Sequence, residues 1–218
     1  MRQKTFIFDL DGVIVDTAKY HFFAWQNLAK SIGVNFTHED NEQLKGVSRV
    51  QSLELILGWG NKTATQEEKD IWLVQKNEEY LTFIEKMDES EILPDVERVL
   101  QFLKEHNQKI VLGSASKNAK PILEKVNLLR YFDAIVDGND VSKAKPDPEV
   151  FLVGADKVYS KPESCIVFED SVAGVQAANQ AAMLSIGIGE QNVLHEAKFC
   201  FTDFTKISNE FLLDLINR

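Results

Sequence analysis

Two aspartates only two residues apart are the first side chains in the sequence that could do chemistry. Asp9 and Asp11 follow the apolar run TFIF, and Gly12 allows the chain to turn sharply after them. Two carboxylates in one small space repel each other unless a proton or a cation lies between them. A hard ion such as Mg²⁺, bound by oxygen ligands, resolves this conflict. Alternatively, both residues are solvated loop or helix-capping aspartates, which is the usual role of aspartate after a strand.

Polar residues at the ends of later apolar runs could complete such a site. The hydroxyl of Ser114, after KIVLG, could hold a phosphoryl oxygen, and the ammonium of Lys145 could neutralise it. The run CIVF ends in Glu169 and Asp170, which add oxygen ligands for a metal. Singly, each has a commoner role: a serine caps a helix, a lysine before proline is solvated, and an acidic pair forms a surface turn. Together, at one edge of a sheet, they predict a site for phosphoryl transfer.

The elements that must position these side chains alternate along the chain. Short runs rich in Val, Ile and Phe predict strands buried on both faces, with helix-like segments between them. This alternation predicts an α/β fold, a Rossmann-like parallel sheet with helices on both faces. The predicted strands are TFIF, KIVLGS, DAIVD, CIVF and LSIGIG, and the predicted helices lie in 95–106, 119–129, 147–158, 173–183 and 207–218.

Residues 17–87 break this alternation, because they contain no convincing strand. They contain helical segments instead, and the first of these ends at a plausible C-cap, Gly33. An insertion after the first strand lies over the carboxyl ends of the strands, where open α/β sheets bind ligands. We therefore predict a small α-helical cap domain, 17–87, inserted into a catalytic core made of 1–16 and 88–218. The connections near Asp16 and in 88–94 are then candidate hinges.

Composition and charge limit the possible partners. The 218 residues suffice to bury a core, and a formal net charge of −10 argues against nucleic acid or an anionic membrane as main partner. A phosphate-bearing substrate must then be held by a local cluster of cations. Cys165 and Cys200 lack metal-site spacing, and Cys165 lies in an apolar run, so we expect a buried structural thiol. The apolar stretch near the N-terminus is too short for a signal peptide, so we expect a cytoplasmic protein.

Four segments, DLDGVIVDT, SAS, KPDPEVF and FEDSVAG, resemble in content and order the haloacid dehalogenase superfamily of phosphotransferases. The resemblance spans essentially the whole chain and implies a phosphoaspartyl enzyme. It implies that Asp9 attacks phosphorus in line. It also implies that Mg²⁺ is bound by the side chains of Asp9 and Asp170 and by the carbonyl of Asp11, with Glu169 nearby.

Further segments, DTAKYHFFAW, NEQLKGVSRVQSL, QKNEEY and GSASKN, resemble the β-phosphoglucomutases within that superfamily. This resemblance implies interconversion of β-D-glucose 1-phosphate and glucose 6-phosphate, with glucose 1,6-bisphosphate as activator and intermediate. The partners are then small hexose phosphates, and we expect a monomer. The first rival is a sugar-phosphate phosphatase with the same nucleophile. The second is a catalytically silent phosphosugar-binding protein, against which the intact pair Asp9 and Asp11 argues.

The resemblance also implies roles for individual residues. The resemblance implies that Asp11 is the general acid and base. Thr17 and His21 follow it in the sequence and lie one helical turn apart. His21, with Lys76 from the cap, ties the position of Asp11 to cap closure; its plainer role is a helix-face histidine packed beside Trp25. The resemblance implies that the transferring phosphate is held by Ser114, Ala115 and Lys145. It implies that the distal phosphate is held by Arg49, Ser116, Lys117 and Asn118. The residues that contact the sugar or form the cap loop are then Trp25, Gly46, Val47, Ser52 and Lys76.

Overall fold

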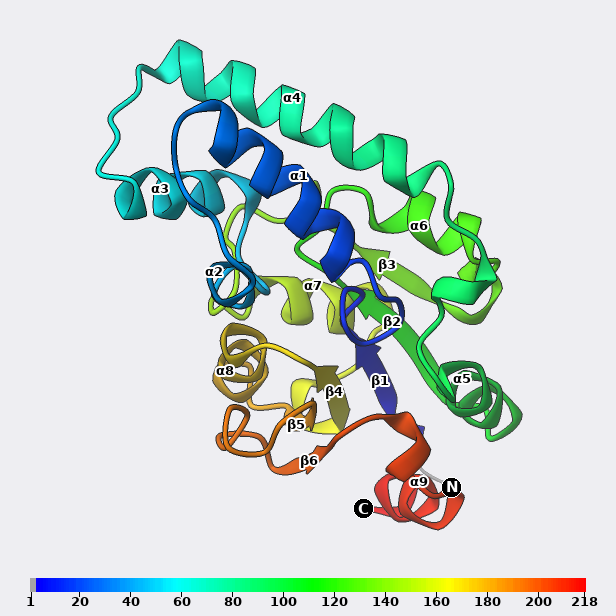
Figure 1. The fold of residues 1–218 in the computed structure, drawn as a ribbon. Coiled ribbons are helices and arrows are strands. Elements are labelled where there is room, and N and C mark those ends of the chain that lie inside the picture. The colour runs from blue at the N-terminus through cyan, green and yellow to red at the C-terminus, as the bar shows by residue number, and fades with distance from the viewer. Residues whose placement is uncertain (1–2) are drawn as a thin grey trace.

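The computed structural model describes residues 3–218, and its sheet is parallel throughout (Figure 1). The strand order is β3-β2-β1-β4-β5-β6, with the first strand of the chain in the middle. Within the described residues the strands are β1 (Thr5–Phe8), β2 (Lys109–Gly113), β3 (Ala134–Val136), β4 (Cys165–Glu169), β5 (Leu184–Ile188) and β6 (Phe199–Phe201).

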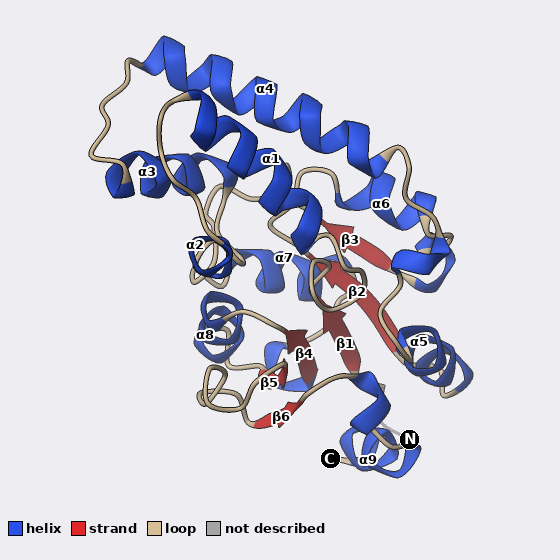
Figure 2. Ribbon diagram, in the orientation of Figure 1, coloured by secondary structure: helices blue, strands red, loops and turns tan. Residues whose placement is uncertain are grey.

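The helices of the described chain fall into two groups (Figure 2). The first group, which we call the helical layer, follows β1 and consists of α1 (Ala18–Ser31), α2 (His38–Glu42), α3 (Arg49–Trp59) and α4 (Gln66–Ile84). The second group alternates with the later strands and consists of α5 (Val96–Glu105), α6 (Ala119–Lys125), α7 (Glu149–Lys157), α8 (Val172–Gln180) and α9 (Asn209–Asn217). None of the helices between residues 3 and 218 combines the length and apolar character needed to cross a membrane.

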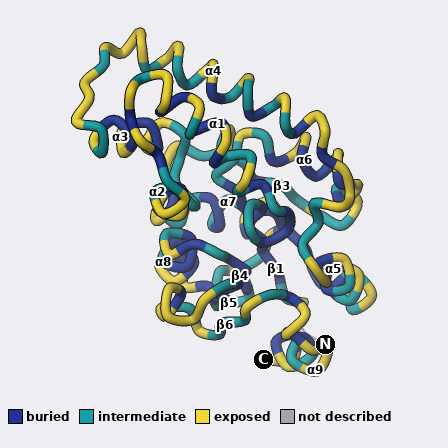
Figure 3. The backbone as a smooth tube through the Cα atoms, in the orientation of Figure 1, coloured by how far each residue is buried: buried dark blue, intermediate teal, exposed yellow. Residues whose placement is uncertain are grey.

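Alternate residues of the central strand face opposite sides of the sheet, and both sides are covered. Phe6 and Phe8 belong to a core cluster with residues of α5, α6 and α9, whereas Ile7 belongs to a second cluster with residues of α7 and α8. The ring of Phe8 stacks on that of Phe168 at 4.8 Å between centroids. Strands buried on both faces require the continuous apolar runs seen in the sequence, and β1 and β4, in the middle of the sheet, are buried throughout (Figure 3). The predicted α/β fold is confirmed.

The helical layer has an apolar cluster of its own. Phe22 and Trp25 from α1 pack with Leu53 and Ile56 from α3, and all four side chains are at most 5% exposed. α1 and α4 lie side by side, and the layer covers the carboxyl ends of β1 and β2 (Figure 1). The sequence predicts helical segments around 17–33, 48–57 and 66–87, which correspond to α1, α3 and α4, and α2 is an additional helix. The division into 17–87 and the remaining chain stays a prediction.

The two connections between the layer and the sheet run side by side. Val15 and Ile92 form an antiparallel bridge, and the amide of Asp16 donates to the carbonyl of Glu91 at 3.0 Å. The Glu91 carboxylate accepts from the hydroxyl of Tyr20 and from the ammonium of Lys19, each at 2.6 Å. These bonds join the entry into α1 to the segment that follows α4, at the positions predicted as hinges.

Candidate active site

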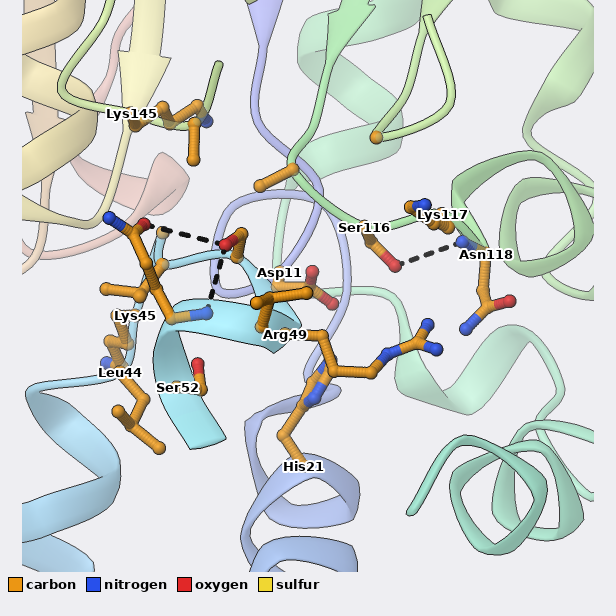
Figure 4. Close-up of a pocket in the computed structure, with 18 of the residues that line it drawn as sticks. Asp11, His21, Leu44, Lys45, Arg49, Ser52, Ser116, Lys117, Asn118 and Lys145 are labelled. Atoms are coloured by element: carbon orange, nitrogen blue, oxygen red, sulfur yellow. Dashed lines mark hydrogen bonds between the residues drawn. The ribbon is translucent and has the colours of Figure 1, made fainter. Parts of the chain in front are cut away.

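A cavity of about 780 Å³ lies between the helical layer and the carboxyl ends of the strands. Side chains from both parts of the chain converge on it, as Figure 4 shows for Arg49, Ser116 and Lys145. All but three of the predicted site residues line this cavity: Asp9, Asp11, His21, Trp25, Gly46, Val47, Arg49, Ser52, Lys76, Ala115, Ser116, Lys117, Asn118, Lys145 and Asp170. The other three, Thr17, Ser114 and Glu169, are fully buried directly behind it.

Asp9 stands at the end of β1, where its amide donates to the carbonyl of Phe168 at 3.0 Å. Its carboxylate is 6% exposed and accepts a hydrogen bond from the Lys145 ammonium at 2.5 Å. Burial raises the pKa of Asp9 to about 7; the charge of Lys145 lowers it, and the charges of Glu169 and Asp11 raise it further. The ion pair with Lys145 thus opposes the effect of burial and favours the charged carboxylate.

Lys145 is held in place by three oxygens. Besides Asp9, it donates to the carbonyl of Gly113 at 3.2 Å and to the carboxylate of Glu169. Burial lowers the pKa of Lys145, but the charges of Asp9 and Glu169 outweigh burial and raise it above its usual range. The ammonium therefore stays charged at the base of the cavity.

Asp11 is held by the residue that precedes α1. The hydroxyl of Thr17, which is fully buried, donates to the Asp11 carboxylate. Burial raises the pKa of Asp11, while this hydrogen bond and the charge of Lys145 lower it. The turn between the two is tight, because Gly12 has φ of 80° and donates to the carbonyl of Val15 at 2.9 Å. The fold therefore brings Asp11 and Thr17 together.

The loop after β2 is shaped by serine hydroxyls. The hydroxyl of Ser114 accepts from the amide of Ser116 at 3.0 Å, and the hydroxyl of Ser116 accepts from the amide of Asn118 at 3.2 Å (Figure 4). Such side-chain to backbone bonds stabilise a turn in place of regular structure. Ala115 and Lys117 consequently line the cavity, while Ser114 is fully buried beneath the loop.

The predicted metal ligands surround one side of the cavity. An added Cβ on Gly12 would lie 2.2 Å from a carboxylate oxygen of Asp170, so Asp170 lies directly against the turn after Asp11. Burial raises the pKa of Asp170 well above its usual range, and the charges of Glu169 and Asp9 add to this. A concentration of buried carboxylate oxygen beside a glycine turn fits a hard cation such as Mg²⁺.

The carboxylates of Asp170 and Glu169 each contact a lysine. The ammonium of Lys45 lies 3.5 Å from Asp170 and 2.8 Å from Glu42. Both oxygens of Glu169 are bound, one by Lys145 and the other by the amide and hydroxyl of Ser171 at 2.8 and 2.9 Å. Between residues 3 and 218, no three His, Cys, Asp or Glu side chains are close enough to hold a metal ion by themselves. A cation bound here would take its remaining oxygen ligands from backbone carbonyls, water or phosphate groups.

Lys76 projects from α4 into an aromatic environment. Its ammonium is 2.9 Å from Nδ1 of His21 and lies over the rings of Trp25 and Tyr80, at 4.7 and 4.8 Å from their centroids. Lys76 is 2% exposed; burial, and then the charge of Arg49, lower its pKa to about 7. Burial and the charges of Lys76 and Arg49 hold the pKa of His21 well below its usual range, so His21 is neutral.

The segment before α3 brings Arg49 to the cavity. Ser48 caps the helix by accepting from the amide of Gln51 at 3.3 Å, which leaves Arg49 in its first turn. Burial lowers the pKa of Arg49. Gly46 has φ of 72°, and an added Cβ there would lie 2.7 Å from the hydroxyl of Ser171. A larger residue at this position would push the layer away from the sheet.

Several further residues that line the cavity are not among the predicted ones, and three of them contact predicted site residues. They are Lys45, which contacts Asp170; Asn77, whose side-chain Oδ1 accepts from the side-chain Nδ2 of Asn118 at 3.1 Å; and Tyr80, whose ring lies tilted against that of His21 at 4.2 Å between centroids. Two of these contacts join the helical layer to loops of the sheet. All three residues lie within or next to the segments that carry the resemblance, but nothing in local spacing distinguishes them from solvated or core residues.

The family model described as "Hydrolase: haloacid dehalogenase-like hydrolase" matches residues 3–182. The chain is 43% identical over 189 residues to the beta-phosphoglucomutase of Bacillus subtilis, covering 86% of this chain and 84% of that one. It is 31% identical over 182 residues to a phosphorylated carbohydrates phosphatase of Thermotoga maritima, covering 81% of each.

Among solved structures, that of a beta-phosphoglucomutase from Clostridium difficile superposes with a TM-score of 0.95 at 39% identity, covering 99% of this chain and 98% of that one. Sequence and structure thus agree with the resemblance found in the motifs. The chain belongs to the haloacid dehalogenase-like hydrolase family.

Proposed function

We propose that this chain is a Mg²⁺-dependent phosphomutase that interconverts β-D-glucose 1-phosphate and glucose 6-phosphate through β-glucose 1,6-bisphosphate. The main support is that one cavity has cationic side chains at two places. Lys145 lies beside Asp9, and Arg49 and Lys117 line the cavity away from that pair. A mutase must bind a bisphosphate at both ends, whereas a monophosphate phosphatase requires one phosphate site. The identity with beta-phosphoglucomutase relatives supports the same assignment.

Asp9 is the proposed nucleophile. Its carboxylate attacks phosphorus in line and forms an acyl phosphate, while the Lys145 ammonium, 2.5 Å away, offsets the charge of the phosphoryl oxygens. Ser114 and Ala115 are expected to hold the same group. Asp9, Asp170 and the carbonyl of Asp11 would hold Mg²⁺, which when bound supplies further charge stabilisation. Glu169 keeps Lys145 charged and in place.

Asp11 is the proposed general acid and base. It protonates the departing sugar oxygen and later removes the proton from the incoming hydroxyl. Burial raises the pKa of Asp11, which favours the protonated form needed for the first of these steps. Thr17 orients the carboxylate through its hydrogen bond. His21 and Lys76 lie on the helical layer, so their contact with the substrate would connect Asp11 to closure of the cavity.

The second phosphate is assigned to Arg49, Ser116, Lys117 and Asn118. A guanidinium grips two phosphate oxygens at once, which suits Arg49 to this role. Trp25, Ser52 and Lys76 are the proposed sugar contacts, with Gly46 and Val47 in the adjoining loop. After the first transfer, the bisphosphate reorients and returns its other phosphoryl group to Asp9. Exclusion of water by the layer would protect the acyl phosphate from hydrolysis. A monomer located in the cytoplasm remains a prediction.

The alternative is a sugar-phosphate phosphatase that uses the same nucleophile. The relative described as a phosphorylated carbohydrates phosphatase, 31% identical, supports this possibility. In that case water rather than a second sugar hydroxyl would attack the acyl phosphate. The alternative requires no distal phosphate site, and no bisphosphate activator.

Phosphorus NMR separates the two functions. Purified protein is mixed with β-glucose 1-phosphate, Mg²⁺ and a trace of glucose 1,6-bisphosphate, and the products are followed over time. Rapid formation of glucose 6-phosphate supports the mutase, whereas dominant release of inorganic phosphate assigns the protein as a phosphatase. No reaction with this or any other hexose phosphate would support the silent phosphosugar-binding protein.

A further inference from the structure

Lys76 is a buried amine whose environment differs from that of Lys45, Lys143 and Lys145, which also line the cavity. The ammonium groups of Lys45, Lys143 and Lys145 each lie within 4.0 Å of at least one carboxylate. The Nζ of Lys76 instead contacts a ring nitrogen and two ring faces. We propose that Lys76 is a nucleophilic amine that forms an imine with phosphorylated aldehydes entering the cavity.

An amine reacts with an aldehyde only when it is uncharged, and the surroundings of Lys76 favour that form. The side chain is 2% exposed, so water does not stabilise its charge, and Arg49 repels that charge. Asp11 and Glu79 favour the ammonium, and the aromatic faces of Trp25 and Tyr80 do so weakly. The resulting pKa of about 7 leaves a large neutral fraction at neutral pH.

His21 can accept the proton that the reaction releases. Its Nδ1 lies 2.9 Å from the Nζ of Lys76, and its low pKa keeps the ring neutral; in the tautomer protonated at Nε2, Nδ1 carries a lone pair that can accept a proton. As Nζ bonds to the aldehyde carbon, one Nζ proton passes through Nδ1 of His21 to the former carbonyl oxygen, giving a carbinolamine. Loss of the hydroxyl group with the second Nζ proton, as water, then gives the neutral imine. No oxidant or reductant is required.

The phosphate group determines which aldehydes reach this amine. Arg49 and Lys117 line the same cavity as Lys76, and the volume of about 780 Å³ lies within the usual range for small-molecule sites. An aldose phosphate in its acyclic form carries both groups, and so does any short phosphorylated aldehyde. Assignment of the phosphate anchor to Arg49 and Lys117 rests on the proposed function, whereas the reactivity of Lys76 rests on its own contacts.

The test uses pyridoxal 5′-phosphate, which combines an aldehyde and a phosphate, followed by reduction with borohydride and peptide mass spectrometry. We expect the pyridoxyl group mainly on Lys76, with a labelling rate that reaches half its maximum near pH 7. At that pH the neutral fraction of Lys76 exceeds that of a lysine with the ordinary pKa on the order of a thousandfold. Inorganic phosphate and glucose 1,6-bisphosphate should each protect Lys76.

Two matched variants and one probe serve as controls. Lys76→Arg, which keeps a cation but cannot form an imine, should lose the label, and Lys143→Gln at the cavity mouth should retain it. Pyridoxal without its phosphate should label Lys76 at least about tenfold more slowly. Labelling spread over exposed lysines, or labelling of Lys76 that phosphate does not slow, would overturn the proposal. Because the assay follows covalent labelling rather than turnover, its failure and failure of the mutase assignment are separate results.

Discussion

The ammonium of Lys145 lies 2.5 Å from a carboxylate oxygen of Asp9 and also binds Glu169, so one buried cation joins the ends of β1 and β4. Asp9, Glu169 and Lys145 together carry a net negative charge, because two carboxylates surround one ammonium. A second cation would neutralise this charge. The proposed nucleophile is therefore oriented by the protein alone, and the chemistry expected of it follows from this arrangement.

Asp9→Ala should abolish turnover, because it removes the proposed nucleophile, and the other carboxylate bound to Lys145, that of Glu169, is fully buried. We expect a loss of at least about four orders of magnitude in the rate of glucose 6-phosphate formation. Asp156→Ala changes an exposed aspartate on α7 and should leave the rate unaltered. Substantial mutase activity in Asp9→Ala would transfer the nucleophile role to another residue.

Arg49→Ala should reduce mutase flux about a hundredfold, corresponding to loss of a charge-assisted phosphate contact of roughly 3 kcal/mol. Hydrolysis of acetyl phosphate, which lacks a distal phosphate, should change much less. Both rates are measured in the same preparation, and Arg130→Ala, a half-exposed arginine outside the cavity, is the matched control. Equal losses in the two activities would remove Arg49 from the distal phosphate site.

Gly12→Ala should weaken activation by Mg²⁺. The new Cβ would lie 2.2 Å from Asp170, and φ of 80° is unfavourable for alanine, so Asp170 must move. We expect the Mg²⁺ concentration for half-maximal activity to rise at least about tenfold, and calorimetric titration with Mg²⁺ to show the same change. Gly58→Ala, inside α3 with open space around its Cβ, is the control. Unchanged Mg²⁺ affinity in Gly12→Ala would count against Asp170 as a ligand.

Lys76 should make stability depend on pH in a defined direction. Its folded-state pKa of about 7 is below the ordinary value of 10.5, so between these values the unfolded chain holds a proton that the folded protein lacks. The free energy of unfolding should therefore rise with pH in this window, by about 1.4 kcal/mol per pH unit, and be independent of Lys76 below it. Urea unfolding of the native protein and of Lys76→Met between about pH 7 and about pH 9 measures this slope.

The contribution of Lys76 is the difference between the two slopes in this pH window. Lys143→Met, which removes a mostly exposed ammonium, should keep the slope of the native protein. Parallel slopes for the native protein and Lys76→Met would mean that Lys76 has an ordinary pKa.

Tyr80→Phe should leave stability unchanged or increase it by up to about 1 kcal/mol. Tyr80 is buried, and its hydroxyl, although close to that of Thr17, lacks a hydrogen bond of good geometry among the described residues, which is destabilising. Tyr20→Phe removes a hydroxyl that donates to Glu91 at 2.6 Å and should cost about 1 kcal/mol. Urea midpoints of the two variants are compared. A clear loss of stability in Tyr80→Phe would show that the hydroxyl has a partner in solution.

The central strands could be predicted because burial on both faces leaves continuous apolar runs. β6 could not, because its three residues are only half-buried at the edge of the sheet and pair with β5 alone. α2 is five residues long, too short for helical periodicity to appear. Its capping box, formed by Thr37 and Asp40, was a usable signal.

Those site residues could be predicted that lie at the carboxyl end of a buried strand. Asp9, Ser114 and Glu169 each follow or end a buried run, so topology alone brings them together. The contacts of Lys45 with Asp170 and of Asn77 with Asn118 depend on how the helical layer sits over the sheet. That placement is decided by long-range packing, which no local pattern in the sequence records.

The strand order has a consequence for synthesis of the chain on the ribosome. β1 lies in the middle of the sheet, and its Thr5 pairs with Lys109 of β2 on one side and with Cys165 of β4 on the other. Its apolar side chains therefore emerge long before either neighbour is translated, while the helical layer emerges next and can pack its own apolar cluster. A nascent chain of this protein must protect β1 until β4 has been made, so molecular chaperones that bind short apolar segments are expected to engage it during translation.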